Sequence, residues 1–128
     1  MPAPINLKKF NKKLNPFTCE LQLYRTHNQE YRVITSGGTD DIHIEDEVIL
    51  IETTDPVTLN LPDPNSAAGH IYTVKKKVGA SPNTNVDPEP VGTNIDGDHH
   101  PFYMGKNLQC TRFYSDGVEY WIIGNYIP

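Results

Sequence analysis

The sequence predicts an all-β domain, a small antiparallel β-sandwich or barrel-like domain of short strands. Eleven prolines and nine glycines are spread along all 128 residues, a pattern typical of many short strands joined by turns. No segment combines the 3.6-residue apolar period of an amphipathic helix with capping residues. The length suits one domain, which we place at residues 19–128, after an extended N-terminal arm at residues 1–18.

Four short segments in the first half of the domain carry the patterns of strands. Residues 19–25, CELQLYR, alternate apolar and polar side chains, and residues 30–36, EYRVITS, are rich in Tyr, Val, Ile and Thr. Residues 48–51, VILI, form an uninterrupted apolar run, which predicts a strand covered on both faces. Residues 57–61, VTLNL, alternate between two prolines, which end the strand because proline cannot donate to a strand ladder.

A lysine-rich strand and a long loop follow. Residues 70–77, HIYTVKKK, predict a strand on which at least one of the three successive lysines faces the less solvated side. Residues 79–101 are rich in Pro, Asn, Asp and Gly, so we expect mostly loop there, with short extended pieces.

Residues 107–127 predict a β-hairpin that turns at Asp116-Gly117. A two-residue turn would place Phe113 opposite Tyr120. The second strand of the hairpin, VEYWII, is apolar on both faces, and covering both faces of several strands is hard for a domain of this size without a partner chain. This predicts a homo-oligomer, and the candidate interface residues are the apolar side chains Val57, Leu59, Leu61, Tyr120, Trp121 and Ile123.

Three segments in a fixed order resemble a known module. They are DEVILIETTDPVTLNLPDPNSAAGHIYTVKK at residues 46–76, TNIDG at residues 93–97 and TRFYSDGVEYWII at residues 111–123. This order resembles a β-rich module of bacteriophage tail and head fibre and appendage proteins, and of structural proteins of large DNA viruses. The resemblance spans roughly residues 40–124. It implies a structural or adhesive virion component, commonly trimeric, without enzymatic activity.

Charge and hydropathy exclude two classes of function. A net charge of −5 and a pI near 5.4 argue against general nucleic-acid binding, which requires a basic surface. No apolar run approaches the roughly 18 residues that span a bilayer, and no signal segment is recognised, so no membrane insertion is expected. Cys19 and Cys110 are expected to be thiols of a protein made in the host cytoplasm, with a disulfide between them left open.

One stretch departs from the acidic balance, KKFNKK at residues 8–13. It is either a solvated arm or a docking tail for an acidic partner surface. In a virion protein, this arm would be the natural attachment segment to the particle. The anchoring candidates are Lys8, Lys9, Phe10, Lys12 and Lys13.

Residues 96–100, DGDHH, carry carboxylates and imidazoles, which bind zinc and other divalent ions. Exposed turn residues are the favoured interpretation, because adjacent histidines point apart on an extended chain; a metal site or a receptor-contact loop are the alternatives. The weak candidate ligands are Asp96, Asp98, His99 and His100. No nucleophile motif or phosphate loop is present, so we predict neither an enzyme nor a cofactor.

Two functional hypotheses follow. The first is a non-enzymatic virion structural protein, a fibre, spike or capsid-decorating homotrimer that acts in particle attachment or adhesion. Its partners would be copies of itself, other virion proteins bound through the arm, and a host surface receptor or glycan contacted by residues 79–101. The alternative is a monomeric carbohydrate-binding β-sandwich module, in which an exposed Trp121 would stack against sugars.

Overall fold

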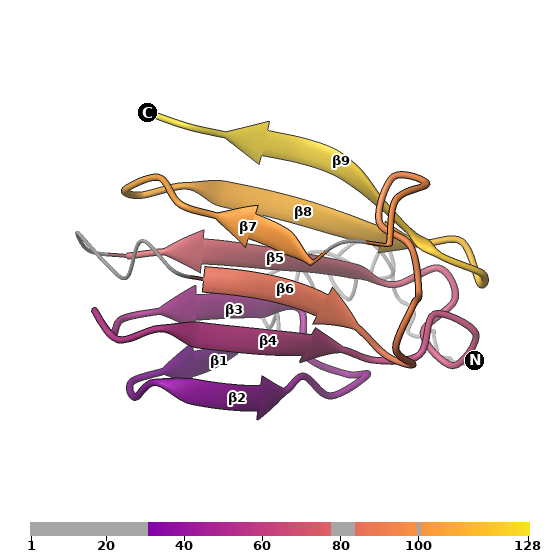
Figure 1. The fold of residues 1–128 in the computed structure, drawn as a ribbon, viewed down its shortest axis with the longest axis horizontal. Helices are drawn as coiled ribbons and strands as arrows, with labels where there is room; N and C mark the ends of the chain where they lie inside the picture. Colours follow the sequence, from indigo (N-terminus) through magenta and orange to yellow (C-terminus); the bar gives the residue numbers. More distant parts are fainter. Residues whose placement is uncertain (1–30, 78–83, 100) are drawn as a thin grey trace, which may run out of the picture.

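The computed structural model describes residues 31–77, 84–99 and 101–128, which form nine strands in two sheets (Figure 1). This confirms the all-β class. The described residues contain no helix long and apolar enough to cross a lipid bilayer. The five-stranded sheet consists, in spatial order, of β1 Tyr31–Ile34, β3 Val48–Ile51, β5 Ile71–Lys76, β8 Cys110–Ser115 and β9 Tyr120–Tyr126. The four-stranded sheet consists of β2 Gly38–Asp41, β4 Val57–Leu61, β6 Thr84–Pro88 and β7 Phe102–Met104.

The chain alternates between the two sheets from β1 to β6. In consequence β1, β3 and β5 pair in parallel in one sheet, and β2, β4 and β6 pair in parallel in the other. The antiparallel pairs are β5 with β8, β6 with β7, and β8 with β9, so both sheets are mixed. The antiparallel sandwich expected from the sequence is therefore wrong for the pairs that the first six strands form among themselves. The reason is that each turn there carries the chain across to the other layer, so that consecutive strands do not pair.

The turn after β1 shows how the chain crosses between the layers. A Cβ atom at Gly37 would lie 2.7 Å from the Asp55 Cβ and 2.9 Å from the Pro56 carbonyl oxygen, so this position has room only for glycine. The Gly38 amide donates to the Pro56 carbonyl at 3.0 Å. Pro62, at the other end of β4, accepts the Tyr120 hydroxyl at 2.7 Å. The two prolines thus end β4 while their carbonyls hold the neighbouring segments.

A single core lies between the sheets. Its side chains come from both layers: Val57, Leu59 and Leu61 of β4 are at most 1% exposed, and Ile49 and Ile51 of β3 are fully buried. Each strand therefore points one set of alternate side chains inward and the other set outward. The described residues of one chain supply both sides of this core.

Lys76 is the charged side chain in this core. It is fully buried, and its ammonium donates to the Met104 carbonyl at 2.8 Å. Burial lowers the pKa of Lys76 because removal from water disfavours the charged form. The prediction that one of the three lysines faces the less solvated side is confirmed.

The C-terminal hairpin has a longer loop than expected. Ser115 lies opposite Tyr120, and Phe113 lies opposite Ile122 instead of Tyr120, so the two-residue turn was wrong. The cause is the Asp116 carboxylate, which accepts the amides of Val118 and Glu119 at 2.8 and 2.9 Å and so closes a four-residue loop.

Candidate functional site

The outer surface of the five-stranded sheet is the most unusual part of the molecule. Outward positions on all five of its strands carry large apolar side chains, two each on β1, β3 and β9 and one each on β5 and β8. We call this surface the apolar face; its members are Tyr31, Val33, Val48, Leu50, Ile71, Tyr114, Trp121 and Ile123. Tyr31 is 66% exposed and Ile123 48% exposed, values that belong to surface positions.

Strand pairing places these side chains next to one another. Tyr31 lies beside Val48, and Val33 beside Leu50, on β1 and β3. Tyr114 lies between Ile71 and Trp121 across β5, β8 and β9. Neighbouring side chains on one sheet face contact each other, so the face holds two apolar groups, one at each side of the sheet.

The apolar group on β1 and β3 lines a hollow of about 550 Å³. Glu52 and Lys77 stand at its rim and form an ion pair of 2.6 Å, which keeps both charges at the border of the apolar surface. An apolar hollow that is open to solvent in a single chain is a feature of surfaces that contact something else.

The outer surface of the four-stranded sheet, which we call the polar face, has the opposite character. Its outward side chains are almost all hydrogen-bonding groups: Thr39, Asp41, Thr58, Asn60, Asn85, Asp87 and Tyr103. Asn60 donates to Asp41 at 2.9 Å across β4 and β2. The hydrogen-bonding groups of such a surface find partners in water.

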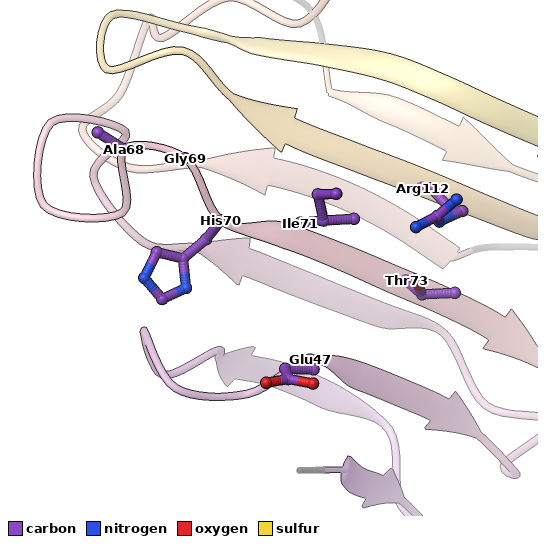
Figure 2. A pocket seen from close by; sticks show the side chains of 7 residues that line it. All are labelled: Glu47, Ala68, Gly69, His70, Ile71, Thr73 and Arg112. Atoms are coloured by element: carbon purple, nitrogen blue, oxygen red, sulfur yellow. The ribbon is translucent and has the colours of Figure 1, made fainter. Parts of the chain in front are cut away.

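A second hollow, of about 380 Å³, lies over β5 and its neighbours β3 and β8, and so between the two apolar groups. We call it the polar hollow, because Glu47, His70, Thr73 and Arg112 line it together with Ala68, Gly69 and Ile71. Figure 2 shows its side chains arising from the start of β3, from β5 with the loop before it, and from β8. Thr73 and Arg112 lie side by side in register. The described residues provide neither Glu47 nor Arg112 with an ion pair.

The predicted interface residues divide between two places. Val57, Leu59, Leu61 and Tyr120 are buried between this chain's own sheets, so a second copy cannot contact them without opening the core. Trp121 and Ile123 lie on the apolar face, 38% and 48% exposed. Sequence reasoning missed Tyr31, Val33, Val48 and Leu50 as surface residues, although the uninterrupted run VILI already indicated that the outer side of β3 requires cover.

The two buried tyrosines near the core's edge serve its structure. The Tyr72 hydroxyl donates to the Ile44 carbonyl at 2.9 Å, and that of Tyr120 to the Pro62 carbonyl at 2.7 Å. Burial, followed by the nearby carboxylates, raises the pKa of Tyr72 to about 12. Burial also raises the pKa of Tyr120. Both phenols stay neutral at physiological pH and act as hydrogen-bond donors.

Residues 96–100, the candidate metal segment, include a turn that is hydrogen-bonded to β9. Asp96 accepts the Ile122 amide at 2.8 Å, and the Asp96 amide donates to the Tyr120 carbonyl at 2.9 Å. Asp98 and His99 are exposed, and His100 lies outside the described residues. Within the described ranges, no group of three or more His, Cys, Asp and Glu side chains could hold a metal ion.

Several predictions fall outside the described residues. They concern the anchoring candidates Lys8, Lys9, Phe10, Lys12 and Lys13, together with Cys19 and the predicted strand at residues 19–25. Cys110, on β8, is a half-buried free thiol. Residues 84–88 form β6, in line with the short extended piece expected in that loop-rich segment.

Comparison with known proteins does not assign this chain to a group. A scan against protein-family models and a search of curated proteins both found no match.

Proposed function

We propose that this chain is a non-enzymatic structural protein of a virion, a fibre, spike or decorating protein, which assembles with copies of itself through the apolar face. The observation that carries the assembly is the contrast between the two outer surfaces of one domain. The polar face presents Thr, Asn and Asp to water, whereas the apolar face presents Tyr, Val, Leu, Ile and Trp.

Burial of apolar surface supplies the driving force for this assembly. Each Å² of apolar surface removed from water contributes about 25 cal/mol, and aromatic side chains such as Tyr31 and Trp121 supply the largest areas. Further copies of the same chain suit the face because it consists of regular strands with side chains at fixed spacing. In a closed ring of three, each copy presents this face to its neighbours around the threefold axis. We expect a homotrimer, as the resemblance to viral fibre modules implies.

A structural role also agrees with how the chain uses its titratable groups. The three buried groups with shifted pKa values, Tyr72, Lys76 and Tyr120, each donate a hydrogen bond to a backbone carbonyl in or beside the core. Groups committed in this way hold segments together. In the proposed virion, the lysine-containing arm at residues 1–18 attaches the domain to other particle proteins, and residues 79–101 contact a host receptor or glycan.

A matched pair of variants tests the assembly. Light scattering of the full chain should give three times the chain mass of 14.4 kDa. Leu50→Glu on the apolar face should shift the chain to monomers, whereas Asn60→Glu on the polar face should leave the mass unchanged. A monomeric wild-type protein across the micromolar range would overturn the proposal.

The attachment role requires its own experiment. Particles produced with a chain that lacks residues 1–18 should lose this protein, while the separately purified shortened chain remains trimeric and keeps its β-sheet circular dichroism. Retention of the shortened chain in purified particles would contradict the anchoring role.

The alternative function, a monomeric carbohydrate-binding module, is favoured by one observation, the exposed indole of Trp121. Its N–H donates to Asp116 at 2.7 Å, which holds the ring on the surface beside Tyr114. This alternative predicts a monomer in which added glycans shift the tryptophan fluorescence. A trimer with unchanged fluorescence would exclude it.

A further inference from the structure

The polar hollow places two opposite charges between the apolar groups of the apolar face. Arg112 lies on β8, two residues before Tyr114, and Glu47 lies directly before Val48 of β3. The strand β5 runs between β3 and β8, so their backbones are about 10 Å apart.

Other charged side chains of the same sheet have partners within the chain. Arg32 pairs with Asp46 at 2.8 Å, and Lys77 with Glu52 at 2.6 Å. The Lys75 ammonium donates to a backbone carbonyl at 2.7 Å. In the described part of the chain, by contrast, the side chains of Glu47 and Arg112 make neither an ion pair nor a hydrogen bond.

This difference matters once the apolar face is covered. A neighbouring copy that contacts both apolar groups also covers the polar hollow between them and removes Arg112 and Glu47 from water. A charge that is buried without a partner is strongly destabilising, whereas a paired and hydrogen-bonded one is tolerated. The assembly therefore requires an acidic partner for Arg112 and a basic partner for Glu47.

We propose that Glu47 of one copy pairs with Arg112 of the neighbouring copy across the assembled apolar faces. This inference rests on the proposed self-assembly. The occupant is a second copy because every copy carries both the acid and the base, so the face is complementary in charge to itself. Thr73 and His70 line the same hollow and offer further hydrogen-bonding groups to the carboxylate and the guanidinium.

The pair would determine the register of the copies. Contacts between flat apolar surfaces have no preferred direction, so Val, Leu and Ile alone permit several sliding arrangements. An ion pair between Glu47, fixed at the start of β3, and Arg112 on β8 permits only one of these arrangements, and mismatched charges act against the others.

Charge reversal tests the pair on the full chain. Arg112→Glu and Glu47→Arg should each raise the dissociation constant of the assembly at least tenfold, as measured by sedimentation equilibrium. The double variant Arg112→Glu/Glu47→Arg restores the opposite charges and should return to within about threefold of the wild type. Because Glu47 is half-buried, Glu47→Gln serves as a milder second variant and should weaken the assembly without reversing the charge.

The matched control is Asp87→Arg, a reversal at a half-exposed outward position of the polar face, which should leave the assembly unchanged. If the wild type assembles and the single reversals change nothing, the pair is wrong while the proposed function stands. Weakened single variants without rescue in the double variant also overturn the pair. A monomeric wild type overturns the proposed assembly itself. D-glucose serves as a small polar probe of the hollow. If it dissociates the wild-type assembly, the hollow binds a ligand, and the pair between Glu47 and Arg112 is overturned.

Discussion

The two outer surfaces of this domain differ although the strands beneath them are built alike. In both sheets three strands pair in parallel, and both sheets turn their inner side chains into the same core. On the outside, β3 presents Val48 and Leu50, whereas β4 presents Thr58 and Asn60. The shared core does not require the outer side chains of the two sheets to differ. The difference in polarity therefore indicates that the outer surface of one sheet meets water and that of the other meets another apolar surface.

The largest expected effect concerns what the two sheets share. Leu59→Ala should lower the free energy of unfolding by about 2–5 kcal/mol, because it leaves a cavity in the fully buried centre of the core. Thr58→Ala, one residue earlier on the polar face, should change the free energy of unfolding by less than about 0.5 kcal/mol. Urea denaturation of both variants at low concentration checks this; equal losses would show that the assigned inward and outward positions are wrong.

The next effect separates the two surfaces through two exposed tyrosines. Tyr31→Ala on the apolar face should weaken association by about 2 kcal/mol, roughly thirtyfold in dissociation constant, because it removes a large aromatic contact. Tyr103→Ala on the polar face should have no effect on association. Sedimentation equilibrium provides the comparison, and similar losses from both variants would erase the distinction between the faces.

A smaller effect on the free energy of unfolding should appear at alkaline pH. It arises in the core, so it should not depend on which outer surface is covered. The pKa of Tyr72 is raised from 10.0 to about 12, so its stabilising contribution is complete below pH 10 and is lost as the pH rises through about 12. Tyr72→Phe should flatten the fall in stability over this range, as measured by urea denaturation at a series of pH values. An unchanged pH profile in the variant would refute the assignment.

The smallest effect concerns the orientation of Trp121 on the apolar face. The hydrogen bonds that Asp116 accepts, first from the Glu119 amide and then from Trp121, lower the pKa of Asp116. Its contribution is therefore present above the usual aspartate range and is lost as the pH falls through the lowered value. Asp116→Ala should shift the Trp121 emission and leave the assembly mass unchanged. If the emission maximum is the same in both proteins, the indole is held by other contacts.

The sequence predicts the strands of this molecule better than their partners. Alternation in VTLNL correctly places Leu59 inside and Thr58 outside. The same pattern does not show that β4 pairs with β2 and β6, because pairing depends on turns such as that at Gly37, where the close approach of Pro56 cannot be read from composition.

The candidate site was harder to predict for a related reason. An apolar residue such as Leu61 or Leu50 carries no local signal that distinguishes the core from an uncovered outer surface. The difference arises only when two sheets stack and one side of each becomes the interior. The polar hollow likewise depends on pairing, since β3, β5 and β8 bring together residues that are distant in the sequence.

Oxidative footprinting of the wild-type protein at concentrations above and below its association range tests the central claim most directly. The claim is that a second copy covers the apolar face and leaves the polar face in water. Tyr31 and Trp121 should become several-fold less reactive as the protein associates, while Tyr103, 52% exposed on the polar face, should react at the same rate throughout. Protection of Tyr103 with Tyr31 and Trp121 still reactive would contradict the claim.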